Sequence, residues 1–465
     1  MNTNTATRNE HDLLGNLSVP VDAYFGVHTA RAAENFPLSG ELLSNHPHFI
    51  DALAAVKQAA ATANQDLGLL PTLKSSAIIA ACREVRARRY DTSFVVDMVQ
   101  GGAGTSTNMN ANEVIANIGL EILGHQKGEY SYLHPIEDVN LGQSTNDVYP
   151  TALKIALDRY VGELLEELEQ LRVAFVGKAN EFSTITKMGR TQLQDAVPMT
   201  LGQEFSAFAT TLAEDQARLS EARLLLHELN LGGTAIGTEL NAHPEYRGKA
   251  LAELRKITEI STLTSSLDLI EATSDVGVFV QLSGILKRIA VKLSKTCNDL
   301  RLLSSGPRAG FNEINLPARQ AGSSIMPGKV NPVIPEAVNQ VAFEVIGNDV
   351  TVTLAAASGL LQLNAFEPII ARALFSSMRQ LGAAARILGE KCIDGITANQ
   401  DVLRERVASS IGLVTLLSPT IGYENATLIA QEALLSGKGI VEIAIDKELL
   451  TGAEIDELLA GVHRV

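Results

Sequence analysis

A long run of apolar residues at helical spacing, between Thr151 and Phe175, most constrains what this chain can fold into. The apolar positions step by three or four residues along the run: Leu153, Leu157, Val161, Leu164, Leu168, Leu171 and Phe175. This period marks one face of an α-helix. Because such a helix exceeds the usual globular length of about 8–20 residues, the pattern predicts helices packed side by side in a bundle.

The same period returns three more times along the chain. It runs from Leu201 to Leu229, where Asp215 interrupts the apolar seam, and it covers about 268–303 and 335–390. Apolar stripes on several long helices favour a bundle shared between subunits, and a monomeric bundle is the alternative. The sequence thus predicts a mainly α protein.

Composition excludes several classes of protein. The net charge of −15 argues against a nucleic-acid partner, because a phosphate backbone is held largely by Lys and Arg. The N-terminus has no apolar signal region and the chain has no long uncharged apolar run, so we expect neither secretion nor a membrane span. Three cysteines without a C-x-x-C pair suit free thiols in the cytoplasm. The nine histidines show no zinc-like spacing, and we predict no metal site.

Loop-forming residues divide the helical patterns. Pro, Gly and Asn gather near 15–40, 100–112, 140–150, 230–245 and 306–332. We predict three domains: an N-terminal domain over 1–142, a central domain of long bundled helices over 143–396, and a small C-terminal helical domain over 397–465.

Polar, glycine-rich stretches precede several of the expected helices. They read "QGGAGTSTNMNANEV" at 100–114, "LGQSTNDVYPT" at 141–151 and "GSSIMPGKVNP" at 322–332, and "GRTQLQDAVPMTLGQE" at 189–204 is a related stretch. Hydroxyls, amides and backbone N–H groups at helix N-termini form donor arrays suited to carboxylates. For any one of these stretches, the alternative to a carboxylate-binding role is that its residues only cap a helix or form a turn.

The chain resembles the aspartase/fumarase superfamily of lyases. "GSSIMPGKVNP" is similar to the signature loop of that family, and the similarity runs from "DLLGNLSVPVDAYFGVHTARAAENFPLSG" near the start to "GITANQDVL" near the end. The resemblance implies a mainly α, three-domain homotetramer whose central bundle is shared by all four subunits, with active sites built from three subunits each. It also implies anti elimination from a succinyl compound to give fumarate.

The resemblance implies roles for individual residues. Ser323 matches the catalytic base, whose alkoxide needs stabilisation by N–H donors or a cation. The positions that match substrate-binding residues are Thr105, Ser144, Thr145, Asn146, Thr191, Gln192, Ser324, Lys329 and Asn331. Glu336 matches a supporting carboxylate that partners a histidine in fumarases. Glu239 departs from the family, which generally has glycine there.

Within the family, the motifs favour the aspartase branch. Gln192 replaces the histidine of the fumarase-like "GRTHLQD", and "NPVIPE" replaces "NPTQCE". We therefore expect conversion of L-aspartate to fumarate and ammonium, with no required cofactor and with activation by Mg²⁺ left open. Fumarate hydratase, or a lyase for another substituted succinate, is the second hypothesis. A catalytically silent helical scaffold is the third.

Overall fold

The structure is a computed structural model that describes residues 6–461. Residues 1–5 and 462–465, at the outer ends of the first and third predicted domains, lie outside the described residues. The chain divides into two compact units. The first contains Met1–Leu165, Arg218–Lys287 and Glu344–Gln380, and the second contains Glu166–Ala217, Arg288–Phe343 and Leu381–Val465. The division into three domains stays a prediction.

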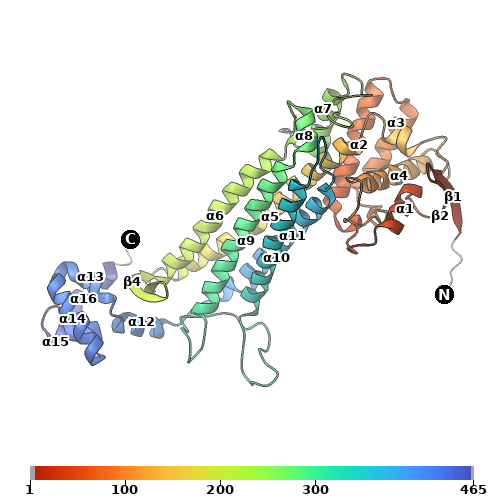
Figure 1. Cartoon of the computed structure of the whole chain (residues 1–465). Coiled ribbons are helices and arrows are strands. Elements are labelled where there is room, and N and C mark those ends of the chain that lie inside the picture. Colours follow the sequence, from red (N-terminus) through yellow and green to blue (C-terminus); the bar gives the residue numbers. More distant parts are fainter. Residues whose placement is uncertain (1–5, 462–465) are drawn as a thin grey trace. The chain divides into compact units, whose positions relative to one another are not determined.

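Long helices dominate the chain, which confirms the mainly α prediction (Figure 1). They are α5 (Thr145–Glu181), α6 (Leu201–Leu225), α9 (Gly277–Leu303), α10 (Val333–Ala357) and α11 (Glu367–Lys391). The periodic stretch over 335–390 forms two helices, because the chain turns between them through a bridge that pairs Leu360 with Leu363. The stretch over 201–229 ends its helix at Leu225, and Leu229 belongs to the two-residue strand β5 (Glu228–Leu229).

The remaining elements of the first unit include α2 (Pro47–Asp66), a helix rich in alanine. The others are β1 (Thr7–Asp12), β2 (Gly15–Pro20), α1 (Val27–Asn35), η1 (Leu43–Asn45), α3 (Thr72–Arg86), η2 (Asp91–Ser93), α4 (Thr105–Ile122), η3 (Pro135–Val139), α7 (Tyr246–Thr258), β6 (Thr264–Ser265) and α8 (Leu269–Ser274). The α2 helix packs on α3, α4 and α7 and buries most of its side chains. β1 and β2 form an antiparallel hairpin, and β5 pairs with β6 in parallel.

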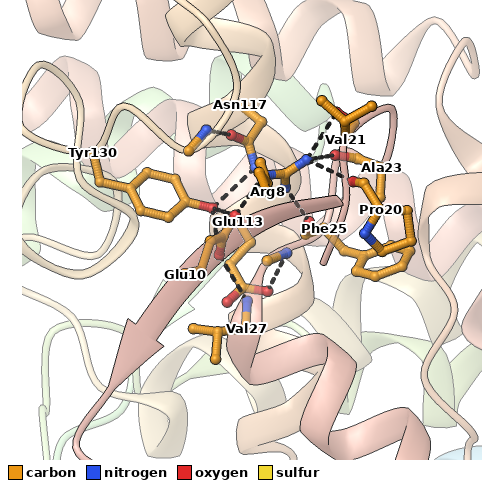
Figure 2. Close-up of polar contacts among 12 residues, drawn as sticks. Arg8, Glu10, Pro20, Val21, Ala23, Phe25, Val27, Glu113, Asn117 and Tyr130 are labelled. Carbon is orange, nitrogen blue, oxygen red and sulfur yellow. Dashed lines mark hydrogen bonds and ion pairs between the residues drawn. The ribbon is translucent and has the colours of Figure 1, made fainter. Parts of the chain in front are cut away.

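Two charged side chains, Arg8 and Glu113, fasten the N-terminal hairpin to α1 and α4 (Figure 2). The Arg8 guanidinium donates to the carbonyls of Pro20, Val21, Ala23 and Phe25 at 2.7–3.0 Å. From α4, the Glu113 carboxylate accepts the backbone N–H groups of Gly26, His28 and Thr29. Burial raises the pKa of Glu113 to about 7, although these N–H donors oppose the shift. The segment "YFGVHT" is therefore held at both ends.

Ion pairs and a serine hydrogen bond join the long helices inside the first unit. Arg223 of α6 donates to both carboxylate oxygens of Asp158 on α5, at 2.6 and 2.9 Å. Ser283 and Lys287 of α9 donate to Asp349 of α10, at 2.8 and 2.5 Å. These pairs fix the helices against one another at their polar positions, where an unpaired buried charge would cost several kcal/mol, on the order of 3–5.

The second unit combines two small sheets with the C-terminal helices. β3 (Thr186–Thr191) and β4 (Gln194–Thr200) form an antiparallel hairpin, and β7 (Ile314–Asn315) pairs antiparallel with β8 (Thr397–Ala398). The C-terminal helices are α12 (Gln400–Ser409), α13 (Leu413–Ile421), α14 (Tyr423–Ser436), α15 (Ile440–Asp446) and α16 (Gly452–Gly461), and the short η4 (Ile393–Gly395) precedes them. Their apolar core includes Leu417, Ile429 and Ile443, and Met188 of β3 packs into it.

Asp215, which interrupts the apolar seam of α6, lies fully buried in the second unit. Lys292 and Arg288 of α9 each contact its carboxylate at 2.9 Å. A charged residue thus sits in the bundle because two cations on the neighbouring helix accompany it.

Cys82, Cys297 and Cys392 are free thiols, as predicted, and all three are buried. Across the described residues, none of the helices combines the length and the apolar character needed to cross a membrane.

Candidate active site

The candidate residues fall into two groups, one in each compact unit. Thr105, Ser144, Thr145 and Asn146 belong to the first unit. The second unit holds Thr191, Gln192, Ser323, Ser324, Lys329, Asn331 and Glu336. The roles of all these residues remain predictions.

Ser144, Thr145 and Asn146 lie at the N-terminus of α5, where backbone N–H groups lack helical partners. The buried carboxylate of Asp147 accepts the N–H of Ser144 at 3.0 Å, and those of Gly232 and Thr234 at 3.1 and 3.0 Å. Burial raises the pKa of Asp147 to about 7, and these three donors act against the shift. One carboxylate therefore ties the start of α5 to the 230–245 loop.

The start of α4 lies close to the start of α5. A Cβ atom on Gly104 would stand 2.2 Å from the Tyr149 ring, so only glycine permits this approach. Asn108, one turn along α4, donates to the Thr145 hydroxyl at 3.1 Å. Thr105 is exposed, and its hydroxyl donates to the Gly102 carbonyl at 2.7 Å. The structure therefore brings the first group together around two helix N-termini.

The loop at 230–245 contacts the same group. Asn146 donates to the Ala235 carbonyl at 2.7 Å, and Asn230 donates to the Asn146 carbonyl at 3.0 Å. In this loop Glu239 has a φ of 57°, a left-handed conformation that favours glycine. Its carboxylate lies 3.1 Å from Arg247 in a half-exposed ion pair.

We predict that Glu239→Gly is more stable than Glu239→Ala by about 1 kcal/mol in free energy of unfolding, because alanine keeps the left-handed strain. Both variants lose the Arg247 ion pair, so their difference isolates the backbone term. Urea unfolding of the two variants measures it. Equal midpoints would show that residue 239 is not strained in solution.

In the second unit, the loop that carries Ser323 supplies hydrogen-bond donors to the serine itself. The Ser323 Oγ accepts the backbone N–H groups of Ile325 and Met326, at 3.2 and 2.9 Å. Two N–H donors converging on one oxygen favour its deprotonated form, because they stabilise negative charge on it. Ser323 is half-buried, whereas the neighbouring Ser324 is exposed.

Hydrogen bonds at its base close the Ser323 loop. The Gly322 N–H donates to the Lys329 carbonyl at 2.8 Å, and the Asn331 amide donates to the Gly322 carbonyl at 2.8 Å. A Cβ on Gly322 would stand 2.6 Å from the Lys329 oxygen, so only glycine fits. The Lys329 side chain is exposed, and Glu336, in the first turn of α10, faces Arg301 across 4.0 Å.

Thr191 and Gln192 lie at the tip of the β3–β4 hairpin, where their side chains are exposed. Gln192 and Leu193 form its two-residue turn, with φ values of 53° and 64°. Positive φ at both positions matches the twist of a hairpin, yet it strains residues other than Gly or Asn. No hydrogen bond joins this turn to the Ser323 loop among the described residues of the second unit.

An ion cluster fixes the base of the hairpin. The fully buried Glu313 carboxylate contacts Lys187 and Arg190 of β3 at 3.0 and 2.5 Å, and Arg406 of α12 at 3.1 Å. Burial by itself would raise the pKa of Glu313, but Arg190 and Lys187 hold it below its usual range. The strand that leads to Gln192 is therefore anchored by three cations on one carboxylate.

Comparisons with known proteins show which family the chain belongs to. A family model described as "Lyase" matches residues 15–347, and one described as "Fumarase C C-terminus" matches residues 413–460. The chain belongs to the aspartase/fumarase superfamily of lyases. It is 61% identical over 460 residues to an aspartate ammonia-lyase of Pseudomonas canavaninivorans, covering 99% of this chain and 97% of the relative. It is 55% identical over 454 residues to the aspartate ammonia-lyase of Escherichia coli strain K12, covering 97% and 95%.

Solved structures of the superfamily share the fold. A fumarate lyase:delta crystallin from Brucella melitensis, bound to cobalt, is 56% identical with a TM-score of 0.96, covering 99% of each chain. A class II fumarase from Schistosoma mansoni is 35% identical with a TM-score of 0.91, covering 98% of each chain. The mainly α, fumarase-like fold expected from the sequence is therefore confirmed.

Sequence reasoning missed the polar residues that support the superfamily motifs. Lys57, Asn108 and Asn140 support the 140–147 segment, and none of them was predicted to contribute to the site. The signal was present in two places. A lysine stands on the otherwise apolar face of "ALAAVKQAAA", and asparagines recur within one turn of "TNMNAN".

Proposed function

We propose that this chain catalyses the reversible anti elimination of ammonia from L-aspartate, giving fumarate through an aci-carboxylate intermediate. The observation that carries the proposal is the identity of 54–61% to aspartate ammonia-lyases over nearly the whole chain. Two backbone N–H groups that converge on Ser323 Oγ also support the proposal, because they would stabilise the serine alkoxide that acts as the base.

In the proposed reaction, the Ser323 alkoxide removes the proton from the β-carbon of aspartate. The electron pair of that bond moves onto the neighbouring carboxylate, which becomes an aci-carboxylate dianion. The electron pair then returns to form the carbon–carbon double bond of fumarate. The C–N bond breaks at the same time, and ammonia leaves with the electron pair of that bond. The Ile325 and Met326 N–H groups stabilise the alkoxide before the proton moves, and this lowers the cost of holding an unprotonated serine.

In this proposal, the candidate residues of both units bind the two carboxylates of the substrate. Lys329 supplies a compact positive charge, and Asn331 and Ser324 supply neutral polar contacts. From the first unit, Thr105, Ser144, Thr145 and Asn146 supply hydroxyls and an amide beside helix N-termini. Thr191 and Gln192 face the amine in this proposal, and Glu336 supports the pocket. No step of the proposed reaction uses a cofactor.

We propose a homotetramer whose active sites combine both groups of residues from different subunits. Apolar side chains at the end of α10 and before α11 support it, because Leu354, Leu360, Leu361 and Phe366 are exposed within the first unit. Leu361 is 87% exposed, which is costly for a leucine that nothing covers. Free, buried thiols suit a cytoplasmic location, which is part of the proposal.

The ultraviolet absorbance of fumarate tests the reaction directly, measured once with L-aspartate and once with L-malate. We expect efficient turnover of aspartate and little or none of malate. A leaving hydroxide needs a proton from an acid such as histidine, whereas an amine that is already protonated leaves as ammonia. Comparable turnover of malate would identify the chain as a fumarate hydratase.

Gln192→Leu should weaken the binding of aspartate more than that of succinate, by roughly 10-fold relative to succinate, because one hydrogen bond to the ammonium group is lost. Succinate lacks the amine and serves as the internal reference. Leucine has a similar shape and meets the same positive φ, so the strain of the turn is preserved. KM for aspartate and the inhibition constant of succinate measure the two effects. Equal weakening of both would remove Gln192 from the amine site.

A further inference from the structure

A buried lysine that the proposed reaction does not use stands out in the first unit. Lys57 lies in the middle of α2 and is 0% exposed. The buried residues around it in the sequence include Ala54, Ala55, Ala59, Ala60 and Ala61. An ammonium group in such surroundings is costly unless it is paired. Burial lowers the pKa of Lys57 to about 7, and the Asp147 carboxylate opposes this shift. A methionine or leucine would satisfy the packing without that cost.

The ammonium group of Lys57 contacts the segment that leads into α5. Its Nζ donates to the Asn140 Oδ1 at 2.8 Å. The same oxygen accepts the side-chain amides of Asn108 and Asn112 from α4, each at 3.2 Å. The Asn140 amide in turn donates to the Gln143 carbonyl at 3.1 Å. Asn140 is therefore held by donors from two helices and itself braces the turn before Ser144.

One of these donors, Asn108, also contacts a candidate substrate-binding residue. The Asn108 amide that approaches Asn140 also donates to the Thr145 hydroxyl at 3.1 Å. Asn112 makes the same contact with Asn140, but its other contact is with the Met109 sulfur at 3.5 Å. The route from Lys57 to Thr145 therefore passes through Asn140 and Asn108, and Asn112 lies beside it.

The charge of Lys57 also lies near the start of α5. The groups that face it are Asp147 on α5 and Cys82 on α3. Burial raises the pKa of the Cys82 thiol to about 12, so it stays neutral. From α4 the neighbours are the neutral amides of Asn108 and Asn112. Tyr246 on α7 faces Asp147, and burial raises its pKa well above the ordinary value.

The geometry points to Lys57 as a positioning residue of the proposed active site: through Asn140 and Asn108 it fixes Thr145 and the N-terminus of α5 to receive a substrate carboxylate. This inference rests on the proposed function, because the ligand is the dicarboxylate of that reaction. Lys57 touches no substrate. It sets the orientation of a hydroxyl that does.

Lys57→Met removes the charge and the donor at nearly constant volume. We expect the inhibition constant of succinate and KM for aspartate to rise by roughly 10- to 100-fold, the range for a lost hydrogen bond to a charged group, with kcat little changed. Asn64→Leu is the matched control. Asn64 is also on α2 and donates to the same segment, at the Leu141 carbonyl, 2.8 Å away. It has no route to Thr145, and we expect changes below about threefold.

A double-mutant cycle separates positioning from a general structural role. If Lys57 acts through Thr145, then Lys57→Met should change succinate binding much less in a Thr145→Val background than in the wild type. A purely structural effect would add in full to the effect of Thr145→Val. Additive changes, or a Lys57→Met variant that matches Asn64→Leu, would overturn the inference.

If Lys57→Met does not fold, a second pair of variants decides. Asn108→Leu and Asn112→Leu each remove one donor from Asn140, but only the first loses the contact with Thr145. We expect Asn108→Leu to weaken succinate binding at least fivefold more than Asn112→Leu, and equal effects would overturn the inference. Calorimetry with succinate gives these values without turnover. A wild type that binds succinate but does not consume aspartate would refute the proposed function alone.

Discussion

Ser323→Ala should abolish the elimination while leaving the chain folded. The rate should fall by at least about 10²–10⁴-fold, the usual contribution of a general base, and further if no other group can remove the proton from carbon. The side chain lies in a loop and is half-buried, so its loss removes little packing. Fumarate release from L-aspartate gives the rate, and circular dichroism with thermal unfolding checks the fold.

Ser324→Ala is the matched control for this prediction. Ser324 is adjacent in the same loop, but no donor to its oxygen is found in the part of the chain that the structure describes. We expect a moderate rise in KM, because its proposed role is contact with substrate. If Ser324→Ala were the inactive variant and Ser323→Ala kept near-normal turnover, the assignment of the base would move by one residue.

The long helices could be predicted from the sequence because apolar spacing acts over consecutive residues. The pattern beginning at Leu153 lies within α5 as expected. The break near Leu360 was missed, since α10 and α11 keep the same period on both sides of it. The β3–β4 hairpin was missed for another reason. Its turn is formed by Gln192 and Leu193, which are not the Asn-Gly or Gly residues that mark such turns in a sequence.

The polar framework of the site was less predictable than the site residues themselves. Ser323 and Lys329 stand out in the sequence because they lie in a long and specific motif. Lys57 and Asn140 are about eighty residues apart in sequence, and only the packing of α2 against the segment before α5 brings them together. The spacing of residues along a short stretch of sequence does not predict contacts between residues so far apart. Stabilisation of the Ser323 oxygen by N–H donors or a cation was expected as a requirement of the chemistry, but the groups that contact it depend on the turn of the loop.

The second large effect concerns assembly, and it follows from the proposed sharing of active sites between subunits. Ser144 belongs to the first unit and Ser323 to the second. If one active site takes these serines from different subunits, a Ser144→Ala chain and a Ser323→Ala chain are each inactive alone. Mixed tetramers of the two should regain activity. Random equal mixing leaves both serines intact in about one quarter of the sites of a cyclic or dihedral assembly.

A second mixture makes this result quantitative. The wild type is combined in equal amounts with a chain that carries both substitutions, and native mass spectrometry confirms that mixed tetramers have formed. If the two serines of a site come from different subunits, about one quarter of the sites again stay intact. If they come from one subunit, about one half stay intact, because both substitutions are then on the same chain. The two mixtures should therefore have equal activity if sites are shared. Zero activity in the first mixture with half activity in the second would show that each site lies within one chain.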